Sequence, residues 1–388
     1  MNRPTDGSCV HACRSQETSV LRSSAKTKKP KLEATMKRLS KYLPATLLWL
    51  ICCSPIGQPQ EAELPLVKID QAQKHRGTHF FSVREGTDFE PLRQNNLEWL
   101  TLVPWGFQEG VGGAEISHHD GDSLHMKQHE DHWVRNIALA RAAGFKVFLK
   151  PHLWIHNPPE GKWRSDIYPP DDKVWQEWQR TYSEFILRYA KVAERAEAEM
   201  FCIGTEFTSL TLKKPEFWRD LIQEIRKVYS GQITYAANWY EEFEQISFWD
   251  QMDFIGIQAY FPLVDHHNPN VPQLVKAWDE HLPAIESTQK KYNRPILFTE
   301  MGYRSTASGA IRPWEWRENI REPDSLYSPQ TQANCYQAFF DVFWEQDWFA
   351  GVHIWQMRSD FVAKPEQKDQ DFFPQGKPAE QIIAKGFE

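Results

Sequence analysis

Short apolar runs alternate with longer amphipathic stretches from His75 to the carboxyl terminus. The runs have the length of strands buried on both faces, and the stretches between them place apolar residues at helical spacing. Strands are predicted over His75–Phe81, Leu97–Val103, Lys146–Trp154, Phe201–Ile203, Ile233–Ala236, Phe254–Ile257, Ile296–Phe298 and Val352–Trp355. Helices are predicted over Asp131–Gly144, Val174–Ala198, Pro215–Tyr229, Val271–Tyr292 and Thr331–Trp344. Eight strands that alternate with helices indicate an α/β protein with a single (β/α)8 TIM barrel.

The residues before the first predicted strand have a different pattern. Residues 1–35 are polar and basic without a hydrophobic period, which predicts disorder. A basic segment and then an apolar run occupy residues 36–57, which is the order of a secretory signal, and residues 58–74 form a polar linker to the barrel domain at 75–388. Because such signals begin a protein, we interpret Met36 as the true start and residues 1–35 as an upstream misreading of the start site. We expect an exported protein (periplasmic, extracellular or lipid-anchored), with contact to a membrane only if this segment stays as an anchor.

The distribution of charge supports this division. Residues 1–60 hold 10 Lys/Arg and 3 Asp/Glu, so the remaining residues hold 45 − 10 = 35 basic and 52 − 3 = 49 acidic side chains, a net charge of −14. An acidic domain is a poor candidate for nucleic-acid binding. Beyond the signal only Cys202 and Cys335 remain, which make no disulfide framework.

Two predicted strands end on a glutamate. Met200–Phe207 ends an apolar run at Glu206, and Arg294–Gly302 ends one at Glu300. In a barrel of this class the carboxyl ends of the strands meet at one mouth, where the chemistry lies; the alternative for each glutamate is a position at a helix N-terminus. The other side chains expected at this mouth are Trp105, His152, Trp154, Asn238, Trp239, Tyr260 and Trp355. We expect the segment after Gly302 and the tail after Trp355 to wrap its rim.

Paired carboxylates among aromatic rings are typical of glycosidic bond hydrolysis. One carboxyl group gives a proton to the leaving oxygen, and the other, ionised, attacks the anomeric carbon or activates water. The chain has 17 tryptophans, and a flat apolar ring matches the C–H face of a sugar. The sequence has no Ser-His-Asp nucleophile elbow and no Gly-rich phosphate loop.

A group of histidines offers a metal site as an alternative. His118, His119, His125, His129 and His132 lie close in sequence, and His125 and His129 are spaced to share one helix face. The glutamate of a zinc-protease helix is missing between them. We therefore interpret the group as a solvated loop and helix start, and we expect no metal and no cofactor.

Several motifs together resemble glycoside hydrolase family 113, a clan A family whose members include β-1,4-mannanases. The motifs are Lys150–Trp154, Ile203–Glu206, Gln258–Pro262, Thr299–Ser305, Ile311–Trp316 and Pro374–Glu380. The resemblance implies that Glu206 is the acid/base and Glu300 the nucleophile of a retaining mechanism. We predict that Tyr260 hydrogen-bonds Glu300, with a tyrosine at the rim as the alternative, and that Trp355 is the floor under the scissile sugar.

One position departs from the clan pattern. Most clan members place Asn directly before the acid/base, where it contacts the sugar 2-hydroxyl, whereas this chain has Thr205. Asn238 is a candidate to take over that contact. Our hypothesis is a retaining hydrolase of β-linked hexose chains, with β-1,4-mannan as the first candidate substrate. The alternatives are a β-glucanase or exo-acting β-mannosidase on the same site, a metal-dependent hydrolase that uses the histidine-rich loop, or a non-catalytic carbohydrate-binding barrel.

Overall fold

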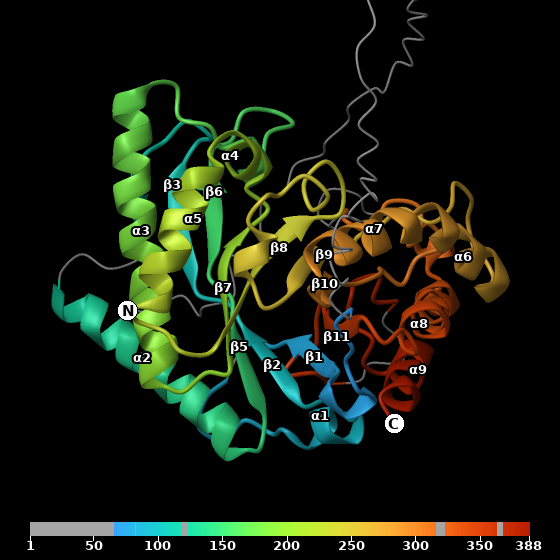
Figure 1. The fold of residues 1–388 in the computed structure, drawn as a ribbon. Coiled ribbons are helices and arrows are strands. Elements are labelled where there is room, and N and C mark those ends of the chain that lie inside the picture. Colours follow the sequence, from blue (N-terminus) through green and yellow to red (C-terminus); the bar gives the residue numbers. More distant parts are fainter. Residues whose placement is uncertain (1–65, 82, 118–122, 316–322, 363–367) are drawn as a thin grey trace, which may run out of the picture. The chain divides into compact units, whose positions relative to one another are not determined.

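The computed structural model describes residues 66–81, 83–117, 123–315, 323–362 and 368–388, and these build a closed parallel barrel (Figure 1). The strands follow one another around the barrel in the order β1-β2-β5-β7-β8-β9-β10-β11, with β11 pairing back to β1. The predicted TIM barrel is confirmed. The barrel strands are β1 (His75–His79), β2 (Trp99–Leu102), β5 (Lys146–Leu149), β7 (Met200–Thr205), β8 (Gln232–Asn238), β9 (Ile255–Gln258), β10 (Ile296–Met301) and β11 (Phe349–Ile354).

The strands are apolar on both faces because each face meets a different part of the core. One set of strand side chains, including Trp99, Phe148, Met200 and Leu297, forms a separate cluster inside the barrel. The alternate positions face outward and join the larger cluster formed with the helices. Most of the strands therefore read as continuous apolar runs, which is why they could be found in the sequence, whereas β1 is polar and contains two histidines.

The helices surround the barrel, with α2, α3 and α5 on one side and α6 to α9 on the other (Figure 1). Their bounds are α1 (Glu90–Gln94), α2 (Ser123–Ala142), α3 (Asp172–Arg195), α4 (Thr208–Lys213), α5 (Pro215–Arg226), α6 (Val271–Ala277), α7 (Leu282–Tyr292), α8 (Pro329–Phe343) and α9 (Pro378–Gly386). The single helix predicted over Val271–Tyr292 is wrong, because α6 and α7 are separated there by a short 3₁₀ turn. Pro283 explains the break, since it lacks the N–H that would continue the first helix and instead fits the first turn of the second.

Two of the predicted strands continue above the barrel mouth as a second small sheet. A break at Pro104 separates β2 from β3 (Trp105–Glu109), and a break at Pro151 separates β5 from β6 (His152–His156). Leu102 pairs with Leu149, before the proline breaks, and Trp105 pairs with His152, after them. In both pairs the partners are 47 residues apart in sequence, so the pairing register does not change across the breaks. The predicted third strand, Lys146–Trp154, is therefore two strands that keep one register, and β4 (Ile116–Ser117) adds an antiparallel edge.

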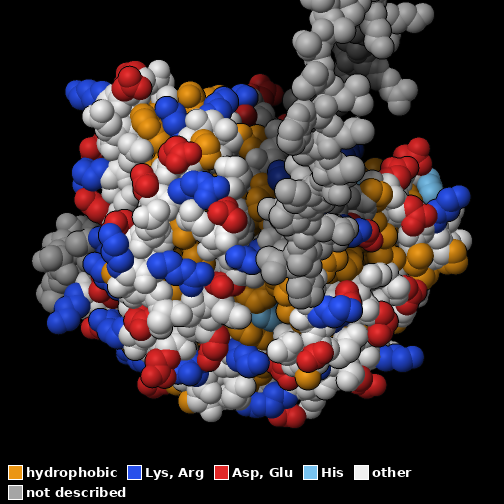
Figure 2. Space-filling model, viewed as in Figure 1, with side chains coloured by type: hydrophobic (Ala, Val, Ile, Leu, Met, Phe, Trp, Pro, Cys, Tyr) orange, Lys and Arg blue, Asp and Glu red, His pale blue; other side chains and the backbone are white. Residues whose placement is uncertain are grey.

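The described parts of the two segments expected around the mouth contact residues there. Phe372, from the tail after β11, packs with Tyr260 and Trp355, and Trp314, from the segment after β10, packs beside them. Lys377 binds Ser305 through its ammonium group at 2.8 Å, which joins the two segments. Figure 2 shows hydrophobic side chains gathered toward the centre of the visible face and charged side chains of both signs over the surrounding helices. Among the described residues, the helices are all too short or too polar to cross a membrane.

Candidate active site

Glu300 lies near the carboxyl end of β10 and is almost completely buried, with 4% of its surface exposed. The ammonium group of Lys150, directly after β5, lies 2.5 Å from Oε1 of Glu300. The hydroxyl of Tyr260, two residues after β9, donates to Oε2 at 2.8 Å, as the sequence predicted. Both carboxylate oxygens are thus held by donors that strand ends position.

The pKa of Glu300 is set by a balance between burial and charge. Burial alone would raise this pKa, but the positive charge of Lys150 and its hydrogen bond outweigh burial and hold the pKa at about 2. Burial lowers the pKa of Lys150, and the attraction of Glu300 opposes that change. Lys150 is fully buried and also donates to Oε1 of Gln258 at 2.9 Å, so its amino group is shared between Glu300 and Gln258.

Two neutral histidines complete the surroundings of Glu300. The Nε2 atoms of His79 and His152 lie 3.6 Å and 3.5 Å from Oε1 of Glu300. Burial, together with the charge of Lys150, lowers the pKa of His79 to about 3 and that of His152 well below its usual value. The carbonyl of Ile354 faces Nδ1 of His79 at 3.3 Å, which assigns the proton of His79 to Nδ1 and leaves Nε2 an acceptor.

Glu206 follows β7 and has a different environment. Its φ angle is 58°, in the left-handed region that few residues other than glycine adopt. The guanidinium of Arg164, in the segment between β6 and α3, donates from Nε to Oε2 of Glu206 at 3.0 Å. Arg164 is itself buried and also donates toward Nδ1 of His152 at 3.4 Å, which assigns the proton of His152 to Nε2.

The two glutamates therefore share one wall of the barrel mouth. A continuous series of contacts runs from Glu206 through Arg164 and His152 to Glu300, with separations of 3.0, 3.4 and 3.5 Å. The structure thus brings together two carboxylates, each paired with a cation, around a buried imidazole.

The four predicted tryptophans lie in segments that follow barrel strands at this mouth. Trp355 follows β11 and its ring is parallel to that of His152, at a centroid distance of 6.5 Å and an angle of 5°. Trp105 and Trp154 pack edge to face at 5.8 Å on β3 and β6. Trp239 follows β8 and stacks on Trp314 at 5.4 Å. The rings line the mouth, and Trp105, Trp154 and Trp239 are partly exposed there.

Asn238 lies at the end of β8 and takes part in a polar network beside Glu206. Its amide Nδ2 donates to the hydroxyl of Thr208 at 2.9 Å, and its backbone N–H donates to Glu242 at 2.7 Å. Thr205, which precedes Glu206, is buried, with 1% of its surface exposed. Asn238 keeps its side-chain oxygen as an acceptor beside the site, and its contact with a sugar stays a prediction.

The sequence profile described as Glycoside Hydrolase Family 113 matches residues 73–377. The chain belongs to glycoside hydrolase family 113. The family 113 chain is similar in structure to a β-1,4-mannanase of the same family, determined as a complex, with a TM-score of 0.69 and 27% identity over 81% of this chain and 99% of the other. A second similar structure is the family 113 β-mannanase AaManA from Alicyclobacillus acidocaldarius in complex with ManMIm, with a TM-score of 0.65 and 28% identity over 81% and 97%.

Similarity to more distant structures is limited to the fold. A β-glucuronidase from Ruminococcus gnavus superposes with a TM-score of 0.53 and 13% identity, over 81% of this family 113 chain and 50% of the other. A search of curated proteins finds no match to this chain. The membership in family 113 establishes the protein as a glycoside hydrolase.

Three residues that contact the glutamates of this family 113 enzyme were missed by the sequence interpretation. Lys150 and Arg164 make the ion pairs, and His79 lies beside Glu300. Lys150 had a detectable signal, because a lysine that directly follows the apolar run Val147–Leu149 is placed at the end of a buried strand and requires a charged partner. Arg164 had none, since it lies in a short 3₁₀ helix that is 42 residues from Glu206 in sequence.

The histidine group lies only partly within the described residues. His118 and His119 and the side chain of His125 are outside them. His129 contacts the hydroxyl of Tyr189 at 3.4 Å, and His132 contacts the amide of Asn136 at 2.9 Å, both within the helical layer. In the described part of the chain, no three His, Cys, Asp or Glu side chains are grouped as a metal site.

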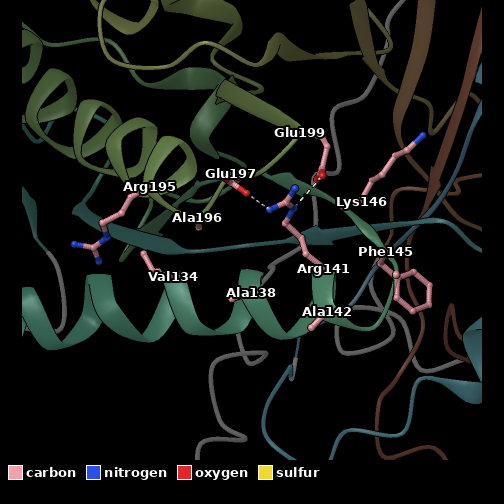
Figure 3. A pocket seen from close by; sticks show the side chains of 11 residues that line it. Val134, Ala138, Arg141, Ala142, Phe145, Lys146, Arg195, Ala196, Glu197 and Glu199 are labelled. Carbon is pink, nitrogen blue, oxygen red and sulfur yellow. Dashed lines mark hydrogen bonds and ion pairs between the residues drawn. The ribbon is translucent and has the colours of Figure 1, made fainter.

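A hollow of about 620 Å³ lies at the opposite end of the barrel, near the amino-terminal ends of β5 and β7 (Figure 3). Its charged groups bind one another: Arg141 donates to Glu197 at 2.6 Å and to Glu199 at 3.0 Å. The end of a TIM barrel away from the strand carboxyl ends serves stability. We assign this hollow no part in the chemistry.

Proposed function

We propose that this family 113 protein is a retaining hydrolase of β-1,4-linked mannan, with Glu300 as the nucleophile and Glu206 as the acid/base. The observation that carries the proposal is the environment of Glu300. A nucleophilic carboxylate has to be ionised and fixed in orientation. Lys150 and Tyr260 hold one oxygen each, and the pKa of about 2 keeps Glu300 ionised at neutral pH.

In the first step a carboxylate oxygen of Glu300 attacks the anomeric carbon, and an ester bond to the sugar forms. The bond between that carbon and the glycosidic oxygen breaks, and Glu206 gives its proton to the departing oxygen. In the second step water attacks the same carbon, gives a proton to Glu206, and the ester bond breaks. Two inversions return the original configuration at the anomeric carbon.

The two imidazoles support the role of Glu300 as a fixed nucleophile. Within the described residues, Nε2 of His79 and Nε2 of His152 are buried and have no hydrogen-bond partner. With the tautomers assigned above, His152 presents an N–H and His79 a lone pair beside Oε1 of Glu300. Both rings are closed to solvent, so they enclose the carboxylate, and the ring of Trp355 packs beside them.

Mannan as the substrate rests on the similar structures, which are described as β-1,4-mannanases. The test is to incubate the domain from Gln58 onward with manno-, cello- and xylo-oligosaccharides and to follow the products by NMR at the anomeric proton. We expect cleavage of manno-oligosaccharides with the β-configuration formed first, and loss of activity in Glu206→Gln and Glu300→Gln. The α-configuration as first product would replace the retaining route with an inverting one, and cleavage of another glycan would change the substrate.

Two further outcomes separate the rival functions. Binding of a glycan without cleavage would support a carbohydrate-binding barrel, and loss of activity on addition of a chelator would support a metal-dependent hydrolase. We also propose that residues 36–57 direct export, which mass spectrometry of the mature amino terminus tests. An amino terminus upstream of Met36 would contradict this.

A further inference from the structure

Glu242 is a fully buried carboxylate that none of the steps above uses. It lies in the turn after β8 and accepts four hydrogen bonds. Its Oε1 accepts from the hydroxyls of Tyr235 at 2.7 Å and Thr211 at 2.8 Å. Its Oε2 accepts from the backbone N–H of Asn238 at 2.7 Å and the hydroxyl of Thr208 at 3.2 Å. A buried carboxylate with four donors is a costly feature that needs a reason.

The four donors come from the helix that follows Glu206 and from the strand beside it. Thr208 and Thr211 belong to α4, which begins two residues after Glu206. Tyr235 and Asn238 belong to β8, the neighbouring strand. Glu242 therefore ties the chain that follows the acid/base to the strand beside it.

The network reaches the backbone of Glu206 itself. The hydroxyl of Tyr235, which donates to Glu242, accepts the backbone N–H of Phe207 at 2.6 Å. The backbone N–H of Glu206 donates to the carbonyl of Ala236 at 2.9 Å. The peptide groups on both sides of Glu206 are thus bonded to β8, and the second depends on a hydroxyl that Glu242 orients.

This fixation matters because Glu206 has a left-handed backbone, with φ at 58°. A non-glycine residue in that region costs free energy and keeps the conformation only where the surroundings impose it. If the hydrogen bond to Phe207 were weakened, the backbone could relax toward ordinary angles. That change would swing the Glu206 side chain, because the direction of its Cα–Cβ bond depends on the backbone angles.

We propose that Glu242 is a positioning residue that, through Tyr235, holds Glu206 in the orientation needed for proton transfer. The inference rests on the proposed function of Glu206 as acid/base. It concerns the proton donor alone, because the donors around Glu300 come from other strands. Loss of Glu242 should therefore impair the step that needs an acid and leave the nucleophile intact.

Leaving-group chemistry separates these two effects. An aryl glycoside with a dinitrophenyl leaving group needs no proton from the enzyme, whereas an oligosaccharide does. The experiment measures kcat and KM on both substrates for the wild type, Glu206→Ala, Glu242→Gln and Tyr235→Phe, using the sugar that the wild type cleaves. Glu241→Gln is the matched control, since it makes the same change at the adjacent, exposed residue.

We expect Glu242→Gln and Tyr235→Phe to lower kcat on the oligosaccharide about 10- to 100-fold, a part of the general-acid contribution. kcat/KM on the dinitrophenyl glycoside, which reports the first step alone, should stay within about 2-fold of the wild type, and Glu241→Gln should change neither value. A merely structural role would lower the rates on both substrates together, including kcat/KM on the dinitrophenyl glycoside. That result, or no change on either substrate, would overturn the inference.

Tyr235→Phe keeps the test decisive if Glu242→Gln does not fold, because it removes only the hydroxyl between Phe207 and Glu242. The same data judge the proposed function separately. If Glu206→Ala shows no difference between the two leaving groups, Glu206 is not the acid, and the role of Glu242 falls with it. If Glu206→Ala shows the difference and the Glu242 and Tyr235 variants do not, only the positioning role is wrong.

Discussion

The two glutamates at the barrel mouth have contrasting environments. Glu300 lies within the strand β10, between a buried lysine and a tyrosine, and its side chain is 6% exposed. Glu206 lies beyond the end of β7 with a left-handed backbone, and its side chain is 13% exposed and is paired with an arginine from a short 3₁₀ helix outside the barrel. Residues at barrel strand ends thus hold one carboxylate, and a residue outside the barrel strands holds the other.

This difference suits the two proposed roles. A nucleophile keeps one charge and one orientation until it reacts, so a rigid buried ion pair serves it. An acid/base group loses and regains a proton in every cycle and must meet both a leaving group and a water. The following predictions test this division, from the largest expected effect to the smallest.

The largest effect is expected from the two glutamates themselves. Glu300→Gln should lower kcat/KM on the order of 10⁴-fold or more with every leaving group, because no substrate can dispense with the nucleophile. Glu206→Gln should lower it by about 10²–10⁴-fold only where the leaving group needs a proton. Steady-state kinetics with oligosaccharides and dinitrophenyl glycosides measure both. Equal losses on both substrates for both variants would remove the distinction between the two sites.

The next largest effect is expected on the free energy of unfolding at acid pH, and it comes from His79 beside Glu300. The pKa of His79 is about 3 in the folded protein and 6.5 as a free side chain, so the unfolded chain binds the proton more tightly. The stability that neutral His79 contributes is complete above pH 6.5 and is lost as the pH falls toward 3, by about 5 kcal/mol. Urea unfolding of the wild type and His79→Asn between pH 7 and 3 measures this.

As the pH falls from 7 to 3, the wild type should lose more unfolding free energy than His79→Asn does. His156→Asn is the control, because His156 is exposed at the end of β6. A difference that does not change with pH would mean that His79 is not buried as a neutral group.

Lys150→Met should lower the free energy of unfolding by about 3–5 kcal/mol, because it leaves Glu300 buried without its cation. Since Lys150 is the main group that lowers the pKa of Glu300, the acid limb of kcat/KM should also move to higher pH. Lys146→Met, at the exposed start of the same strand, is the control for the loss of a lysine. An unchanged acid limb would show that another group keeps Glu300 ionised.

Arg164→Met should have the smallest effect, about 2 kcal/mol of unfolding free energy, since it removes a charged hydrogen bond from a carboxylate that water can reach in part. Chemical denaturation beside Lys150→Met gives the comparison directly. If the arginine variant loses as much stability as the lysine variant, the two carboxylates are equally dependent on their cations.

The sequence was sufficient for the parts of the fold that depend on local hydrophobic pattern. The buried strands, their order and the glutamates at two strand ends could be found because each is a continuous apolar run with an abrupt polar end. The break of the helix at Pro283 was missed although a proline marks it, because the apolar period on either side suggested one helix. The break at Pro151 was missed in the same way, and the strand β3 that follows Pro104 was not predicted.

The contacts around the glutamates could be predicted only in part. Tyr260 was found because it follows a predicted strand at the barrel mouth, and its hydrogen bond to Glu300 is present. Arg164 and Glu242 depend on how segments far apart in sequence fold over one another, which no local pattern encodes. Glu242 in particular reads as one of several acidic residues in a polar turn, and only its burial distinguishes it from Glu241.

The constant offset of 47 residues between the two strand pairs has a consequence for protein engineering. The pairing of β2 with β5 continues upward as the pairing of β3 with β6, which carries Trp105, His152 and Trp154 above the mouth. The turn at residues 110–115, between β3 and β4, lies outside the paired positions. Loops of different length can therefore be grafted there to recognise new branches of a glycan, while the aromatic wall keeps its place because the barrel itself sets its position.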